Sequence, residues 1–242
     1  MLVIPAIDLK DGKCVRLLRG DFNLSTVYSD HPADIAAKWQ EKGAKRIHVV
    51  DLDGSRDGLP RNMDVIREIV RVVDVPLQVG GGIRDMKTVD EYISMGVSYV
   101  ILGTVALKDR KFVLDACANY RGRVILGLDA RDGRVAVEGW TESTGQSPAE
   151  VASGYKECGL DSIIYTDIQR DGMESGVNIE STKMLAESVD IPIIASGGVA
   201  DIHDIERLLE VADSGIMGVI TGKALYTGAL KLEDAIARVS TP

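Results

Sequence analysis

The sequence predicts a closed (β/α)8 barrel of the TIM type, and three observations point to it. Short, almost wholly apolar runs alternate with amphipathic helical stretches along all 242 residues. Runs of that kind are typical of parallel strands that are covered on both faces. The alternation gives roughly eight strand–helix units, which is the size of a closed barrel. The second half of the chain also repeats the order of motifs found in the first half.

The predicted strands cover residues 2–7, 46–50, 76–79, 99–102, 124–128, 162–165, 192–195 and 217–220. The predicted helices between them cover 32–43, 63–73, 86–96, 110–118, 147–159, 178–188, 202–211 and 232–239. The helix at 147–159 has the clearest start, because Ser147 and Glu150 form a capping-box pattern around Pro148. An open doubly wound sheet is the competing fold. It requires a dinucleotide fingerprint after the first strand, and residues 8–12 do not supply one.

The internal repeat is visible at five places in the same order. Residues 3–13 match 124–134, 47–51 match 163–167, 73–76 match 189–192, 81–82 match 197–198, and 101–104 match 220–223. Chance supplies one such pair easily but not five in sequence. We therefore predict two half-barrels, at about 1–122 and 123–242, within a single domain, because no linker composition separates them.

Composition and charge limit the classes of function. A net charge of −9 disfavours nucleic acid as a partner, because binding its phosphates requires clustered Lys and Arg. No apolar run approaches the about 20 residues that span a bilayer, and the N-terminus lacks the basic region of a signal peptide. Cys14, Cys117 and Cys158 have no metal-ligand spacing and are expected to be reduced thiols. We expect a cytoplasmic protein without membrane or nucleic-acid partners, for which a monomer is sufficient.

Glycine pairs follow the third and seventh predicted strands, and Gly-Thr and Gly-Lys end the fourth and eighth. Free backbone N–H groups at a helix N-terminus suit a phosphate, and the loops after strands seven and eight are a known phosphate position in such barrels. A tight turn is the alternative explanation for either glycine pair. We predict two opposed sites: the first phosphate site (Gly81, Gly82, Gly103 and Thr104) and the second phosphate site (Gly197, Gly198, Gly222 and Lys223).

Carboxylates end the first and fifth predicted strands. Asp8 and Asp129 would face each other across the barrel mouth, where enzymes of this fold have their active sites. Two carboxylates at a cavity suit general acid and base work, provided their surroundings separate their pKa values. The alternative is that each caps a loop. With no cofactor motif and no metal-ligand cluster, the residues point to isomerisation or a simple elimination of an elongated bis-phosphate.

Further polar side chains are predicted near the same mouth: Arg16, His48, Arg84, Trp140, Thr166 and Asp171. Arg84 follows the first glycine pair and suits a phosphate or carboxamide. Arg16 falls in the expected loop after the first strand. His48 lies inside the second strand, where a satisfied core histidine is the alternative to a substrate contact. Trp140 lies in a polar loop and is predicted to act as a stacking lid.

Several motifs together resemble the phosphoribosylformimino-AICAR phosphate isomerase family of histidine biosynthesis. They are residues 5–9, 48–54, 80–84, 166–172, 195–199 and 222–226, so the resemblance covers nearly the whole chain. It implies an Amadori rearrangement, without a cofactor, of an aminoaldose to an aminoketose. It implies that Asp129 is the general acid, assisted by Thr166, and that Asp8 is the base. It also implies that Arg16, Arg84 and Asp171 arrange the substrate and that Trp140 stacks on it.

Three neighbouring functions are weighed against this one. The related cyclase typically has Cys-Leu-Asp-Val at the position of residues 6–9 and lysine at that of Arg16, so it is disfavoured. A dual isomerase that also accepts phosphoribosylanthranilate shares the same aspartates and stays open. A barrel that binds a phosphometabolite without turnover would have no reason to keep both Asp8 and Asp129. Met173 and residues 55–58 depart from the usual family pattern.

Overall fold

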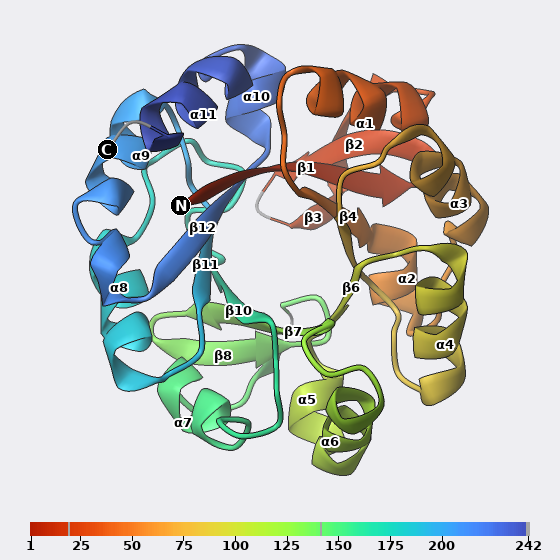
Figure 1. Cartoon of the computed structure of the whole chain (residues 1–242), viewed down its shortest axis with the longest axis vertical. Helices are drawn as coiled ribbons and strands as arrows, with labels where there is room; N and C mark the ends of the chain where they lie inside the picture. Colours follow the sequence, from red (N-terminus) through yellow and green to blue (C-terminus); the bar gives the residue numbers. More distant parts are fainter. Residues whose placement is uncertain (19, 141, 241–242) are drawn as a thin grey trace.

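The computed structural model describes residues 1–18, 20–140 and 142–240, and within them eight parallel strands close a barrel. In order around it they are β1 (Leu2–Lys10), β4 (Ile47–Asp51), β5 (Leu77–Gly80), β6 (Tyr99–Leu102), β7 (Val124–Arg131), β10 (Ser162–Asp167), β11 (Ile193–Ser196) and β12 (Ile216–Thr221). β12 pairs with β1 and thereby closes the barrel. The strands lie at the centre and the helices surround them (Figure 1). The predicted (β/α)8 fold is confirmed.

The outer helices follow the predicted order. They are α1 (Pro32–Glu41), α3 (Met63–Val72), α4 (Met86–Met95), α6 (Arg110–Asn119), α7 (Pro148–Ser153), α8 (Ile179–Ser188), α9 (Ile202–Leu209) and α11 (Leu232–Ser240). The capping box of Ser147 and Glu150 is present, but α7 is shorter than predicted. It ends at Ser153 and Gly154, two poor helix formers. Within the described ranges, no helix is long and apolar enough to cross a membrane.

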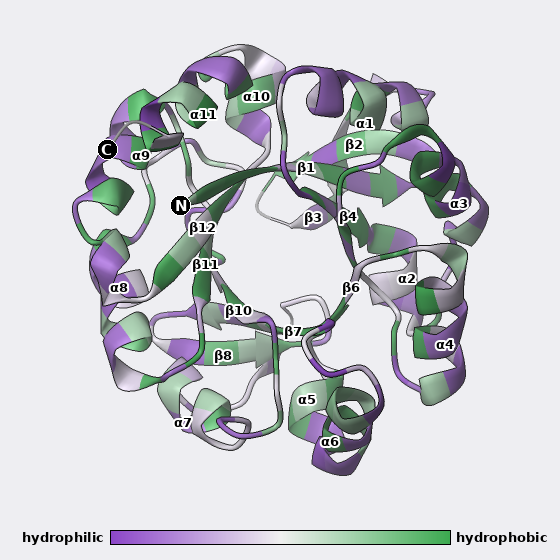
Figure 2. Cartoon of the chain, in the orientation of Figure 1, coloured by the Kyte–Doolittle hydropathy of each residue, from purple (hydrophilic) through white to green (hydrophobic). Residues whose placement is uncertain are grey.

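Two apolar layers form the core: one lies inside the ring of strands, and the other lies between the strands and the helices. Figure 2 shows strands that are mostly hydrophobic and helices that carry hydrophilic stretches. The inner layer fills the barrel with Ile4, Ala6, Ile125, Ile164, Ile194 and Ile220. The outer layer lies between the strands and the helices, and α3 contributes Ile66 and Ile69 to it. Ala6, Ile164 and Ile220 also line the cavity at the mouth, so the inner layer forms its floor.

Several short elements were not predicted, and all but one of them follow a barrel strand. β2 (Lys13–Leu18) and β3 (Asp21–Ser29) follow β1, while β8 (Arg134–Val137) and β9 (Glu142–Ser143) follow β7. The short helices α2 (Leu52–Asp57), α5 (Val105–Lys108) and α10 (Lys223–Thr227) follow β4, β6 and β12, and the 3-10 turn η1 (Ala212–Ser214) precedes β12. Arg16, which we expected in a loop, therefore lies on a strand, β2. Trp140 lies in the short connection between β8 and β9.

The two hairpins that follow β1 and β7 turn in the same way. Asp11 and Gly12 have φ of 50° and 77°, and Asp132 and Gly133 have φ of 51° and 72°. Positive φ at both central residues gives the turn that best matches the twist of paired strands. As a result the aspartates that end the first and fifth predicted strands both gain an antiparallel neighbour: Asp8 pairs with Val15, and Asp129 with Ala136.

Candidate active site

The predicted site residues meet at the mouth formed by the carboxyl ends of the barrel strands. One cavity is lined by Asp8, Arg16, His48, Gly81, Gly82, Arg84, Gly103, Thr104, Asp129, Trp140, Thr166 and Asp171. An adjoining pocket is lined by Gly197, Gly198, Gly222 and Lys223. Asp8, Arg16 and Asp171 line both. The first and second phosphate sites therefore open on either side of a shared group of charged side chains.

Asp129 is held by two neighbours. The indole Nε1 of Trp140 donates to its Oδ2 at 2.8 Å, and Thr166, its register partner on β10, is also hydrogen-bonded to it. Burial raises the pKa of Asp129 above the usual value, and these two hydrogen bonds oppose that rise. A carboxyl with a raised pKa keeps its proton to higher pH, which suits a general acid.

Asp8 is held by Arg16 across the β1–β2 hairpin. Arg16 Nη1 donates to Asp8 Oδ2 at 2.7 Å, and Nη2 donates to the carbonyl oxygen of Ala6 at 2.9 Å. Both charged side chains are largely buried, with exposed fractions of 14% and 15%. A charge-assisted bond in such a place fixes the direction of the carboxylate more strongly than a surface ion pair would.

Asp171 and His48 have shifted pKa values for different reasons. Burial raises the pKa of Asp171 to about 6, and the negative charges of Asp8 and Asp129 add to the rise while Arg16 opposes it. Burial and the positive charge of Arg16 lower the pKa of His48 to about 3. The amide Nε2 of Gln78 contacts its Nδ1 at 2.9 Å. At neutral pH, His48 is therefore a neutral hydrogen-bonding group on the wall of the mouth.

The two glycine turns have the same backbone shape in both halves. Gly81 and Gly197 have φ of 107° and 90°, and the glycine after each also has positive φ. A Cβ on Gly81 would lie 2.2 Å from the carbonyl oxygen of Asp51, and one on Gly197 would lie 2.6 Å from that of Asp167. Only glycine fits either position. Each glycine pair therefore forms a tight turn and also lines a pocket at the mouth, so the two explanations of the pairs do not exclude each other.

A short helix completes each predicted phosphate site. α5 begins directly after Thr104, and α10 begins directly after Gly222. A helix N-terminus leaves N–H groups without internal partners and carries partial positive charge. At the second site, Lys223 Nζ donates to the carbonyl oxygen of Gly172 at 3.0 Å and lies 3.3 Å from Glu174 Oε2. Both helices were missed because each is only about one turn long.

Arg84 lies at the rim of the mouth, where its side chain is 44% exposed. Its Nη2 lies 3.3 Å from Glu138 Oε2, and Lys108 pairs with the same carboxylate. The N–H of Glu138 donates to Thr104 Oγ1 at 3.1 Å. Glu138, like Trp140, has the positive φ that non-glycine residues rarely adopt. These contacts hold the connection between β8 and β9 over the first phosphate site.

The β2–β3 hairpin reaches the same place from the other half of the barrel. Leu17, Gly20 and Phe22 line the cavity. A Cβ on Gly20, which has φ of 70°, would lie 2.4 Å from the ring of Trp140. The β2–β3 hairpin and the β8–β9 connection therefore meet over the mouth, where Gly20 lies against Trp140.

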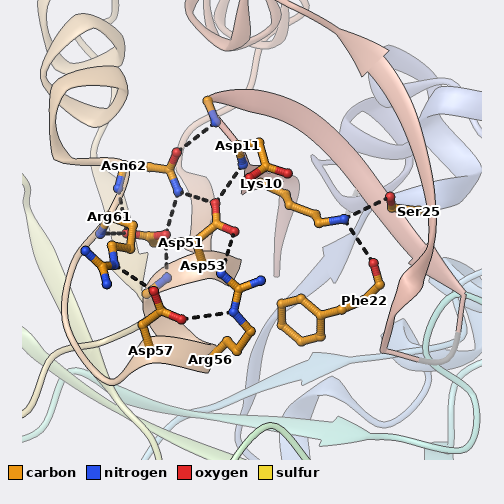
Figure 3. A network of polar contacts seen from close by, with 12 residues as sticks. Lys10, Asp11, Phe22, Ser25, Asp51, Asp53, Arg56, Asp57, Arg61 and Asn62 are labelled. Atoms are coloured by element: carbon orange, nitrogen blue, oxygen red, sulfur yellow. Dashed lines mark hydrogen bonds and ion pairs between the residues drawn. The ribbon is translucent and has the colours of Figure 1, made fainter.

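Asp51 ends β4 but belongs to the scaffold. Its carboxylate accepts hydrogen bonds from the N–H groups of Gly54, Arg61 and Asn62 and from the side-chain amide of Asn62 (Figure 3). Asn62 in turn accepts from the N–H of Gly12, and Asp53 accepts from that of Asp11. This network anchors the turn of the β1–β2 hairpin to α2 and the start of α3.

The second half contains a related tie. Asn178 Nδ2 donates to Asp167 Oδ2 at 2.7 Å, as Asn62 Nδ2 does to Asp51 Oδ1. In both halves the aspartate at the strand end thus holds the asparagine at the N-cap position of the following outer helix, α3 or α8. In the described part of the chain, no group of three or more His, Cys, Asp or Glu side chains is arranged to hold a metal ion.

Fold and site together define a class: a (β/α)8-barrel protein with opposed aspartates at its mouth, between two glycine-rich turns that each lead into a helix. The profile of the family described as "Histidine biosynthesis protein" matches residues 2–231. The chain belongs to this family.

Individual relatives match over almost their full lengths. A protein of Syntrophus aciditrophicus (strain SB) is 61% identical over 237 residues, which are 98% of this chain and 98% of the relative. Proteins of Pelobacter propionicus and Trichlorobacter lovleyi are 54% and 52% identical, over 98% of this chain and 97% and 96% of their own. All three are named 1-(5-phosphoribosyl)-5-((5-phosphoribosylamino)methylideneamino)imidazole-4-carboxamide isomerase.

Proposed function

We propose that this chain catalyses the isomerisation named in its relatives, an Amadori rearrangement of an aminoaldose to an aminoketose in L-histidine biosynthesis. Identity of 61% over 98% of both chains supports the reaction class. The observation that carries the proposal is the placement of Asp8 and Asp129 in one mouth, with a glycine turn and a helix start on either side. A substrate with a phosphate at each end would span that mouth with its reacting ribose between the aspartates.

The geometry supports proton transfer by two opposed aspartates, one acting as acid and the other as base. Asp129, whose pKa is raised by burial, donates a proton to the ribose ring oxygen; the C1′–O bond breaks and the amino nitrogen forms a Schiff base. Thr166 is hydrogen-bonded to Asp129 and assists the acid. Asp8, oriented by Arg16, then removes the C2′ proton to give an enolamine. The enolamine then becomes the ketose: C1′ takes back a proton from Asp8, and the C2′ hydroxyl gives its proton to the Asp129 carboxylate as it becomes the carbonyl, so both aspartates return to their starting states.

The remaining predicted residues bind and orient the substrate. One phosphate would lie at the first phosphate site and the other at the second, each against a helix N-terminus. Arg16, Arg84 and Asp171 orient the middle of the substrate, and His48 offers a neutral hydrogen-bonding group. Trp140 stacks on the substrate, which requires that it give up its hydrogen bond to Asp129. That exchange would free the acid only when substrate is in place.

We also propose a single domain of two half-barrels, at about 1–122 and 123–242, acting as a cytoplasmic monomer without a cofactor. The matching hairpins, glycine turns and aspartate–asparagine ties support the half-barrel division. A molar mass by light scattering close to that of one chain, 26.1 kDa, is the expected result. The mass of a dimer would refute the monomer.

A spectrophotometric assay of the purified protein, with each of the two phosphoribosyl substrates, tests the proposed function. Turnover of the imidazole carboxamide substrate is expected. Turnover of neither substrate would refute the enzyme and leave a phosphometabolite-binding barrel. Turnover of phosphoribosylanthranilate as well would identify the dual isomerase, which keeps the same aspartates.

A further inference from the structure

Arg16, which orients Asp8, is itself held by Tyr226 of α10. The guanidinium carbon of Arg16 lies 5.2 Å from the centre of the Tyr226 ring, a cation–π distance. The hydroxyl of Tyr226 donates to the carbonyl oxygen of Ala6 at 2.9 Å, and the same carbonyl accepts from Arg16 Nη2 at 2.9 Å. The guanidinium of Arg16 thus lies over the ring of Tyr226, and both side chains donate to the same carbonyl oxygen.

The hydrogen bonds of Arg16 to Asp8 and Ala6 use only its two terminal nitrogens. Its buried Nε has no hydrogen-bond partner among the described residues. Further limits on the position of the guanidinium are steric, and they come from α10 and the residue before it. A Cβ on Gly222, the residue before this helix, would lie 1.8 Å from Arg16 Nη2. The guanidinium therefore fits between the backbone of Gly222 and the ring of Tyr226.

Tyr226 is fixed by an aromatic cluster on its far side. The ring of Trp39 meets it edge-on, with centroids 5.6 Å apart and planes at 86°, and the ring of Tyr28 lies 4.8 Å away. The thiol of Cys14 lies 3.2 Å from the Tyr226 hydroxyl. These contacts come from α1, β2 and β3, so the ring cannot turn away from Arg16 without disturbing three elements.

We propose that Tyr226 is a positioning residue for the reaction: it fixes the guanidinium of Arg16 and, through it, the carboxylate of Asp8. The inference rests on the proposed function, which gives Asp8 its task. It assigns a second role to α10, since this short helix also supplies Lys223 to the second phosphate site, directly after Gly222. The same short helix would then help to bind a phosphate and to position the base.

A double-mutant cycle separates this role from simple packing. Tyr226→Leu is expected to lower kcat about tenfold with KM changed less than about twofold, because the cation–π contact is lost. Tyr226→Phe keeps the ring and loses only the contacts of the hydroxyl with Ala6 and Cys14, so its kcat is expected to fall about threefold. In an Arg16→Met background, where there is no guanidinium to fix, each Tyr226 substitution changes kcat less than about twofold.

Tyr92→Phe is the matched control. Tyr92 is a fully buried tyrosine on α4 whose hydroxyl has no hydrogen-bond partner among the described residues, and this variant is expected to retain wild-type kcat. Equal effects of the Tyr226 substitutions in both backgrounds would overturn the proposal, and so would wild-type kcat in Tyr226→Leu. If Tyr226→Leu does not fold, the cycle with Tyr226→Phe decides by the same criterion. An inactive wild-type protein would instead refute the proposed function.

Discussion

At the scale of single residues, surroundings rather than residue type set the chemistry of the mouth. Three aspartates line it, and burial raises the pKa values of Asp129 and Asp171. Asp8 instead has a guanidinium 2.7 Å away. Different surroundings for chemically identical groups are what an acid and a base in one site require. Which aspartate receives which surroundings depends on contacts that sequence patterns do not show.

Asp171 should make stability depend on pH. Its pKa rises from 3.8 to about 6 on folding, so between these values the folded chain binds more protons than the unfolded chain and stability falls as pH rises. Asp171→Asn is expected to raise the free energy of unfolding at pH 7 by about 1–2 kcal/mol, which is less than the full shift implies because Asp171 is half-buried and lines the open cavity. At pH 4 the gain should vanish.

Chemical denaturation of both proteins at pH 4, 5.5 and 7 measures this difference. An equal gain in stability at all three pH values would show that the aspartate is destabilising for a reason other than its charge. Activity should fall in the same variant, since Asp171 is one of the residues proposed to orient the substrate.

Trp140 should control the alkaline limb of the pH–rate profile. Its hydrogen bond lowers the pKa of Asp129, so in Trp140→Phe the acid keeps its proton to higher pH. The alkaline limb of kcat/KM, which reports the free enzyme, is expected to move to higher pH. His48→Gln is the comparison, because His48 is neutral above about pH 3 and should leave both limbs in place. An unmoved limb in Trp140→Phe would contradict the role of Asp129 as acid.

At the scale of elements, the barrel strands and outer helices could be predicted because each carries a local signal: an apolar run, a capping box or a glycine. The short elements at the mouth could not. α5 and α10 are too short for a helical period to show. The hairpins carry a signal in Asp11-Gly12 and Asp132-Gly133, the dipeptide that favours hairpin turns, but the same residues also fit the internal repeat and a loop capped by an aspartate.

The same limit applies to the site residues. The candidates Asp8, Asp129 and Thr166 follow from what ends a predicted strand, whereas the partners of the site residues come from distant segments. Tyr226 and Ala6, for example, are 220 positions apart in the chain. Arg16 lines the cavity at the mouth, but its position on β2 and its closeness to Gly222 follow from the folded chain alone.

The glycines of the first phosphate site should divide into two kinds. In Gly81→Ala the new methyl group would meet the backbone of Asp51 at 2.2 Å, so unfolding free energy should fall by at least about 2 kcal/mol. In Gly103→Ala the nearest atom is 3.8 Å away, so stability should change by less than about 0.5 kcal/mol. KM should nevertheless rise about tenfold in that variant, because the methyl group keeps a phosphate from the backbone.

Thermal unfolding and steady-state kinetics of the two variants check this division. A wild-type KM in Gly103→Ala would show that no phosphate binds against the backbone at that position. Wild-type stability in Gly81→Ala would mean that the turn relaxes around the added methyl group.

At the scale of the whole molecule, two similar halves make a cavity that is open to an elongated ligand. Each half contributes an aspartate, a hairpin, a glycine turn and a short helix, while Arg16 and Asp171 line both pockets. A ligand that reaches both phosphate sites gains the second contact without a second loss of translational freedom. A bis-phosphate analogue should therefore bind at least about 100-fold more tightly than a monophosphate of the same sugar. Equal affinities in a calorimetric titration would show that only one site is used.

We propose that Asp8 acts as the base while the two phosphate sites bind the substrate. Asp8→Asn should lower kcat at least about 1000-fold, the scale of general acid–base catalysis, and leave the dissociation constant of the bis-phosphate substrate within about threefold. Asp132→Asn, an exposed aspartate in the β7–β8 turn, is the matched control and should keep full activity. Near-normal turnover by Asp8→Asn in the spectrophotometric assay would contradict the account.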